Sequence, residues 1–219
     1  MSSWQATFLA EFLGTLSIVA AVLGAGFMVS KLQVQSGLDL FMIASAVAGV
    51  LFVAIATLAN ISGAHFNPIV TLAFWFRKEL ATNQALTYIT AQFIGAATGA
   101  LLANLMFDQP FALSEVNRFS PGALVGEGVA SAGLVLLILL LLLFGKSSLI
   151  AASVALWIFA GHVFTSSTAF ANPAVTLGRI FSSAPSSISA DSAIYFIAAQ
   201  VIGLALALLV FSQLRKERK

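Results

Sequence analysis

The chain has 219 residues and a formal net charge of +2, and it is 60% hydrophobic but only 8% charged. Soluble domains carry about 25% charged residues, so this composition and the mean hydropathy of +1.02 predict an integral membrane protein. The absence of cysteine excludes disulfides and thiolate metal sites, and the small net charge does not indicate a nucleic-acid partner.

Charged residues divide the chain into segments, six of which can hold a membrane span. A spanning helix needs about 20 predominantly apolar residues. The six predicted spans lie near residues 6–28, 40–60, 84–106, 123–144, 148–165 and 192–213. The chain is therefore predicted to form a single all-α membrane domain, residues 1–219, with both termini on one side of the membrane.

Seven of the ten basic residues fall on the side that holds the termini. They are Arg77, Lys78, Lys146, Arg215, Lys216, Arg218 and Lys219, whereas Lys31, Arg118 and Arg179 fall on the other side. The positive-inside rule then places both termini in the cytoplasm, and we expect a bacterial inner membrane as the location. The basic tail from Arg215 is interpreted as a topological anchor, with lipid binding as the alternative.

Two Asn-Pro pairs predict short helices that do not cross the membrane. Asn67-Pro68 and Asn172-Pro173 lie late in the uncharged stretches 40–76 and 147–178, each longer than one span and shorter than two. Asn favours the N-cap of a helix, and Pro favours its first position. The predicted re-entrant half-helices run from Pro68 to about Phe76 and from Pro173 to about Phe181.

The two halves of the chain, about residues 1–110 and 120–215, repeat the same motifs in order. The matched motifs are Glu11-x-x-x-Thr15 with Glu127-x-x-x-Ser131, the two Asn-Pro pairs, and Ala91-Gln-Phe-Ile-Gly95 with Ala199-Gln-Val-Ile-Gly203. Because each half has three spans, the second half must enter the membrane from the opposite face. Such an inverted repeat predicts a functional site near the midplane, between the halves.

The inverted arrangement brings the N-termini of the two half-helices together at the middle of the membrane. Each N-terminus carries roughly half a positive charge from its free N–H groups. If Asn67 and Asn172 turn their side-chain amides into a lumen, they donate hydrogen bonds to a passing oxygen atom while the helix ends repel cations.

Glu11 and Glu127 are carboxylates at membrane depth, where a charge is costly. They are either proton carriers of a transporter or structural acceptors for N–H groups of the re-entrant loops. We favour the structural role because each half has one acid matched to one loop. His65 is expected to brace the first loop, and His162 stands alone in its span. No metal or cofactor is predicted.

Glycine recurs in the spans beside alanine and serine, which is typical of closely packed membrane helices. The run Leu134–Leu143 is interpreted as facing lipid or a partner subunit, outside the pore.

These motifs together resemble the major intrinsic proteins, the aquaporin and aquaglyceroporin family. The resemblance rests on the sequences of residues 10–15, 62–68 and 172–174 and on the two Ala-Gln-x-Ile-Gly segments. It implies six spans with two half-helices, and a pore in every subunit of a homotetramer. It also implies passage of water and small neutral solutes and exclusion of ions. Asn67 and Asn172 match the pore-lining asparagines of the family.

Two positions depart from the family pattern. Ile69 replaces the usual Ala of the first signature, a change expected to be mild. Val175 stands where family members generally carry an Arg that forms the charged wall of the outer constriction. In the family, the other constriction positions lie about twenty residues before the first signature Asn, and twelve and three residues before the second. In this chain these positions are Val47, Ala160 and Ala169. This apolar ring predicts a channel for neutral solutes larger than water, such as glycerol-like polyols, neutral metalloid hydroxides or methylated arsenicals.

Arg179 lies four residues after Val175, one turn further along the same helix face. Its guanidinium either reaches the outer vestibule and partly restores a positive filter, or extends to the outer surface.

Two other functions stay open: a proton-coupled secondary transporter that uses Glu11 or Glu127, and an aquaporin-like anion channel. An enzyme is not expected, because the membrane-depth residues include no nucleophile–base pair.

Overall fold

The computed structural model describes residues 3–216, and in this part of the chain every regular element is a helix. Six helices are long and apolar enough to span a membrane. They are α1 (Ser3–Lys31), α2 (Leu38–Ser62), α4 (Thr82–Met106), α5 (Pro121–Leu143), α6 (Ile150–Phe164) and α8 (Ala190–Lys216). Two short helices, α3 (Pro68–Phe76) and α7 (Pro173–Gly178), follow the Asn-Pro pairs.

The six spans and both half-helices are therefore confirmed, with small shifts at their ends. Most spans extend a few residues beyond their predicted limits. The second half-helix ends at Gly178 and continues as a 3₁₀ turn, η2 (Arg179–Phe181); a second such turn, η1 (Ser147–Leu149), precedes α6. Arg218 and Lys219, which the sequence assigned to the side of the termini, lie outside the described residues.

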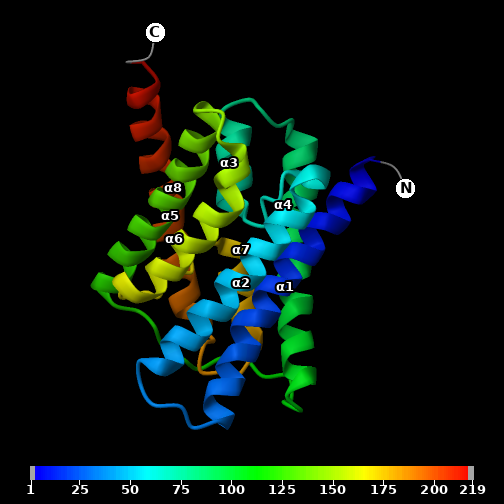
Figure 1. The fold of residues 1–219 in the computed structure, drawn as a ribbon. Helices are drawn as coiled ribbons and strands as arrows, with labels where there is room; N and C mark the ends of the chain where they lie inside the picture. The colour runs from blue at the N-terminus through cyan, green and yellow to red at the C-terminus, as the bar shows by residue number, and fades with distance from the viewer. Residues whose placement is uncertain (1–2, 217–219) are drawn as a thin grey trace.

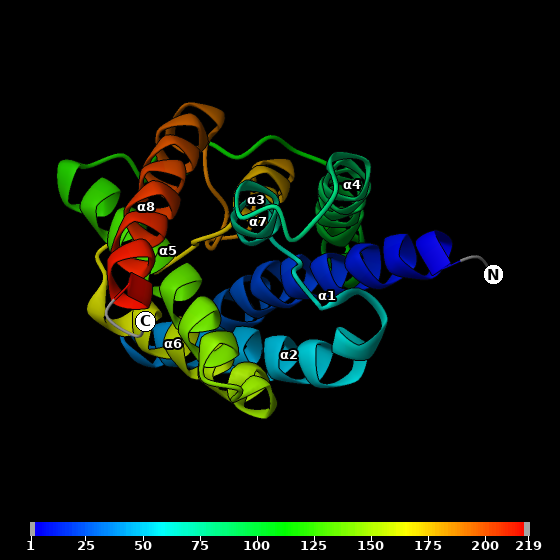
Figure 2. The same cartoon turned by 90° about the horizontal axis from the view of Figure 1, so that it is seen from above.

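The short helices α3 and α7 lie in the middle of the molecule, one above the other (Figure 1). In the view from above they overlap, with α4 to the right, α8 to the left and α1 below them in the picture (Figure 2). Both ends of the described chain lie at the upper end in Figure 1, together with the loop after α3. The loop 32–37 lies at the lower end.

Glycine allows the closest helix crossings, at matching positions of the two halves. A Cβ atom added at Gly95 of α4 would lie 2.4 Å from the carbonyl oxygen of Phe12 in α1. A Cβ added at Gly203 of α8 would lie 2.6 Å from the carbonyl oxygen of Gly128 in α5. The pairs α1–α4 and α5–α8 thus pack backbone to backbone, as small residues permit in membrane helices.

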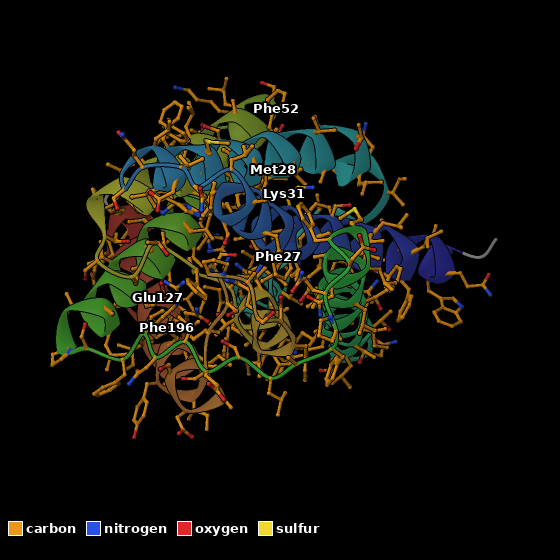
Figure 3. All side chains as sticks on the ribbon, turned by 90° about the horizontal axis from the view of Figure 1, so that it is seen from below. Phe27, Met28, Lys31, Phe52, Glu127 and Phe196 are labelled. Carbon is orange, nitrogen blue, oxygen red and sulfur yellow. The ribbon has the colours of Figure 1, made fainter. Side chains whose placement is uncertain are left out.

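The distribution of side chains agrees with a protein that lies in lipid. Seen from below, Glu127 and Phe196 lie inside the molecule, where α5 meets α8, whereas Phe52 lies on the outer face of α2 (Figure 3). The exposed fraction is 0% for Glu127 and Phe196 and 45% for Phe52. The buried carboxylate is therefore enclosed by protein, and large apolar side chains such as Phe52 lie on the outside.

Candidate functional site: a pore at the meeting point of two half-helices

A cavity of about 230 Å³ lies beside the tips of α3 and α7. Four long helices each contribute a stripe of side chains spaced four residues apart, which keeps the stripe on one helix face. The stripes are Ile18 and Val22 of α1; Val47, Leu51 and Ile55 of α2; Leu134, Ile138 and Leu142 of α5; and Ile150, Val154, Ile158 and His162 of α6. The α6 stripe covers twelve residue steps, or roughly 18 Å of helix axis, so the cavity follows α6 along most of its length.

The lining corrects the interpretation of the run Leu134–Leu143. Leu134, Ile138 and Leu142 face the cavity, while Leu136 and Leu137 are only partly buried. Every residue in this run is apolar, so the sequence pattern does not distinguish the face that lines the cavity from the face that meets lipid. Only the apolar stripes that the other three helices place around the same cavity show which face of α5 lines it.

The two signature asparagines hold the half-helices together across the centre. Asn67 Nδ2 donates a hydrogen bond to the carbonyl oxygen of Ala171 at 2.8 Å, and Asn172 Nδ2 donates to the carbonyl oxygen of Phe66 at 2.8 Å. Each Oδ1 caps its own helix: Asn67 accepts from Ile69 N, and Asn172 from Ala174 N and Val175 N. Both asparagines line the cavity. Since an amide NH₂ has two N–H bonds, one on each side chain remains for a permeating molecule.

The loops that lead into the half-helices adopt a backbone that non-glycine residues seldom use. The φ angles are 52° at Ala64 and 49° at Phe66 in the first loop, and 46° at Ala169 and 47° at Ala171 in the second. Left-handed residues of this kind persist only where their surroundings hold them. In both loops the surroundings include a buried carboxylate.

Glu11 holds the first loop. Its Oε1 accepts hydrogen bonds from Ser62 Oγ at 2.6 Å and His65 N at 2.9 Å. Its Oε2 accepts from Phe66 N at 2.6 Å and Gln92 Nε2 at 2.8 Å. The side chain is fully buried and is not part of the cavity wall.

Glu127 holds the second loop in the same way. It accepts hydrogen bonds from Phe170 N and Ala171 N, both at 2.9 Å, and from Gln200 Nε2 at 2.6 Å. Gln200 also donates to Thr176 Oγ1, as Gln92 does to Thr71 Oγ1 in the other half. The repeated Glu, Gln and Thr motifs thus form one network in each half of the molecule.

His65 contacts both the first half-helix and a neighbouring span. Its Nδ1 lies 3.1 Å from Thr71 Oγ1, and its ring stacks on Phe74 and packs against Tyr88. Tyr88 in turn donates a hydrogen bond from its hydroxyl to the carbonyl oxygen of Ser62. His65 also lines the cavity. Among the described residues, no group of three or more His, Cys, Asp and Glu could hold a metal ion.

The end of the cavity away from the chain termini contains three of the four expected constriction residues. Val47, Ala169 and Val175 line it, but Ala160 does not. Ala160 is exposed on the outer face of α6, because two residues correspond to about 200° of rotation around a helix and Ile158 and His162 face the cavity. The count from the second signature therefore selected the wrong face of α6.

Arg179 lines the same end of the cavity, and its exposed fraction is only 3%. Its Nε donates to the carbonyl oxygen of Ser186 at 2.6 Å, and an Nη also donates to that oxygen. Its guanidinium carbon lies 3.4 Å from the centroid of the Phe170 ring. The side chain is therefore held inside the molecule.

His162 faces the cavity one turn of α6 beyond Ile158. Its Nδ1 lies 2.8 Å from the carbonyl oxygen of Ile158. A carbonyl oxygen only accepts hydrogen bonds, so Nδ1 carries a proton, and Nε2 of the neutral ring is an acceptor. No pattern in the sequence distinguishes His162 from an ordinary buried histidine.

Comparisons with known proteins agree with this geometry. The family model described as "Major intrinsic protein" matches residues 1–149. The aquaglyceroporin AqpS of Rhizobium meliloti (strain 1021) is 40% identical over 200 residues, which cover 91% of this chain and 85% of that protein. The lens fiber major intrinsic protein of Lithobates pipiens is 36% identical over 130 residues, 58% of this chain and 46% of that protein.

A solved structure has the same fold. The X-ray structure of the aquaglyceroporin from Plasmodium falciparum superposes with a TM-score of 0.73 at 24% identity, and the match covers 96% of this chain and 94% of that one. The arrangement of six spans around two opposed half-helices is thus shared with a known channel structure.

Proposed function

Since this chain belongs to the major intrinsic protein family and is a channel for water and small neutral solutes, we propose that its outer constriction admits neutral solutes larger than water. The expected solutes are glycerol-like polyols, neutral metalloid hydroxides and methylated arsenicals. The similarity to AqpS, which is named an aquaglyceroporin, supports this class of solute.

The observation that carries the proposal is the position of Val175 in the cavity wall, together with Val47 and Ala169. These three side chains are small or medium in size and have no polar atoms. A solute with methyl or methylene groups loses little on contact with such a wall, whereas a hydrated ion finds nothing to replace its water shell. A wall of this kind favours molecules that are partly apolar and uncharged.

Polar contacts at the same end come from Arg179 and His162. Arg179 supplies a fixed positive charge and N–H donors, and His162 supplies an acceptor at Nε2. We propose that this pair takes the place of the filter arginine that Val175 replaces: the guanidinium repels cations, and the donor and acceptor orient solute hydroxyl groups. The hydrogen bonds to Ser186 and the contact with Phe170 keep the charge in place.

The surroundings of the two glutamates favour a channel over a proton-coupled transporter. Glu11 and Glu127 each accept hydrogen bonds from two backbone N–H groups and from a glutamine side chain, and neither carboxylate lines the cavity. A carboxylate that carries protons for transport needs access to the solute path. We therefore assign both acids, with His65, to the support of the re-entrant loops.

Transport by purified protein in liposomes tests the proposal. A solute series from water through glycerol and erythritol to a neutral arsenical acid is measured by stopped-flow light scattering. We expect flux linear in the concentration gradient for the polyols, with weak temperature dependence. Permeability to water alone would contradict the wide constriction, and saturable, pH-driven uptake would indicate a transporter. Anion currents in planar bilayers would support the rival anion channel.

We also propose an assembly and an orientation. Large apolar side chains are exposed on the outer faces of several spans, which suits contact with lipid and with other subunits of a homotetramer. Both described ends lie on one side of the molecule (Figure 1), and the excess of basic residues on that side favours a cytoplasmic orientation in a bacterial inner membrane. Cross-linking of the purified protein tests the tetramer.

A further inference from the structure

A second pocket, of about 410 Å³, lies where the end of α3 meets the last turns of α8. It shares no lining residue with the pore. Its lining residues are Phe76, Arg77, Leu208, Phe211, Ser212, Arg215 and Lys216. The residues from α8 lie three, four, seven and eight positions after Leu208, so they form one face of that helix.

The pocket combines a basic rim with an apolar wall. Arg215 and Lys216 are exposed on its rim. The guanidinium of Arg77 lies 4.4 Å from the centroid of the Phe211 ring and forms an ion pair with Glu79. Since Glu79 balances Arg77, the excess charge of the pocket is that of Arg215 and Lys216, about +2. The preferred ligand is therefore an anion with an apolar part.

The apolar wall continues toward the middle of the membrane. Phe76 is 57% exposed, and Leu208 lies two turns of α8 before Arg215 and Lys216, within a span of high hydropathy. The basic residues stand at the end of that span, where the hydrocarbon core meets the headgroup layer. A ligand that fills the pocket thus contacts the headgroup layer with its charge and the hydrocarbon with its apolar part.

We propose that this pocket is a binding site for an anionic phospholipid, with the lipid phosphate at Arg215 and Lys216 and the acyl chains along Phe76 and Leu208. Basic pockets between membrane helices hold anionic headgroups in this way. Arg77 is fixed by Phe211 and Glu79, so the site is largely formed before the lipid binds. The pocket is separate from the pore, and its occupation does not depend on which solute the channel carries.

Native mass spectrometry of delipidated protein tests the proposal. Phosphatidylglycerol and phosphatidylcholine with identical acyl chains are titrated into the wild type and into the double variant Arg215→Gln/Lys216→Gln. The control is Lys78→Gln/Lys146→Gln, which removes the same number of charges from exposed positions on the same side, outside the pocket. Inorganic phosphate is added as a competitor in a separate titration.

We expect phosphatidylglycerol to bind the wild type more tightly than phosphatidylcholine does. Each pocket charge removed should weaken its binding roughly fivefold, or about 30-fold for the double variant. The control variant should bind as the wild type does. An equal loss of phosphatidylglycerol affinity in the control variant would show that the lipid responds only to the total charge of this side of the protein. That result would overturn the proposed binding site. Displacement of the lipid by millimolar phosphate would instead indicate a site for a free anion and would overturn the lipid assignment.

Discussion

The guanidinium carbon of Arg179 lies over the ring of Phe170, 3.4 Å from its centroid, and the next residue, Ala171, has a left-handed backbone with φ of 47°. The second re-entrant loop and the outer end of the pore are therefore joined by one contact. Arg179 is 3% exposed and has its charge fixed by the carbonyl oxygen of Ser186. Its position leads directly to a test of ion exclusion.

Replacement of Arg179 should make the channel leak cations. Two unit charges 4 Å apart repel each other by about 4 kcal/mol at an effective dielectric constant of 20. Loss of even part of this barrier in Arg179→Gln should raise proton and sodium flux roughly tenfold or more, as measured with entrapped pH-sensitive and sodium-sensitive dyes.

Arg118→Gln is the matched control for that experiment. Arg118 also holds the loop near Ser186, through hydrogen bonds to the carbonyl oxygens of Ser187 at 2.6 Å and Pro185 at 2.7 Å, but it does not line the cavity. An equal leak in both variants would assign the effect to a disturbed loop and would refute a charge barrier at Arg179.

Introduction of arginine at Val175 should narrow the pore. Val175 is 5% exposed and lines the cavity, so the longer charged side chain must occupy space that solutes use. We expect Val175→Arg to lower glycerol and arsenical flux roughly tenfold or more and to lower water flux much less. Stopped-flow measurements on matched liposomes check this, with Val175→Ala as the control that should retain all fluxes. Unchanged glycerol flux in Val175→Arg would show that the constriction lies elsewhere.

Single cysteines on α6 should report which face of that helix lines the pore. The natural chain has no cysteine, so labelling has no background. Ile158→Cys should react with a charged, water-soluble thiol reagent and lose most of its solute flux. Ala160→Cys, on the outer face, should keep its flux after the same treatment. Block at position 160 and not at 158 would contradict the orientation of α6.

Two glycines at helix crossings should be indispensable, and a third should not. A Cβ at Gly95 or Gly203 would clash with a carbonyl oxygen of the facing helix, whereas nothing lies within 4 Å of a Cβ at Gly49. Gly95→Ala and Gly203→Ala should each cost roughly 1–3 kcal/mol and lower the melting temperature in detergent. Gly49→Ala should be neutral or slightly stabilising. A normal melting temperature for both crossing variants would argue against close backbone packing.

Glu127 should act on folding and not on proton coupling. Phe170 N and Ala171 N donate to different oxygens of Glu127. In Glu127→Gln the amide oxygen can accept only one of these two bonds, because the amide nitrogen is a donor. The N–H group left unpaired costs about 1–3 kcal/mol. We expect a lower melting temperature and yield, with pH-independent solute flux in the protein that still folds. The exposed Glu115→Gln should match the wild type. Normal stability together with loss of a pH-driven uptake would make Glu127 a proton carrier.

The sequence predicted the centre of the molecule more accurately than its outer end. The Asn-Pro pairs are local signals, because the N-cap preference of Asn and the fixed φ of Pro act within a few residues. The repeat of Glu11 and Glu127 then located the loop supports. The hydrogen bonds from each asparagine side chain to a carbonyl oxygen of the opposite loop are consistent with the inverted repeat. Only the three-dimensional structure identifies their partners.

The outer end depends on distances that local sequence does not contain. The length and path of the loop 165–172 determine which face of α6 lines the cavity. Counting residues back from Asn172 therefore selected Ala160, whereas Ile158 and His162 line the cavity. The position of the Arg179 side chain depends on Ser186, which the loop after η2 folds back toward it. Likewise, the leucines of α5 face the cavity only because α6 and α2 supply the other walls.

The crossed hydrogen bonds between Asn67 and Ala171 and between Asn172 and Phe66 restrict how this protein can change its permeability. They tie the two halves at the midplane, so a rocking motion of one half against the other would break both bonds and expose buried amides and carbonyls. A closure that keeps both bonds must therefore come from side chains or loops at the two mouths of the pore, while the centre stays fixed.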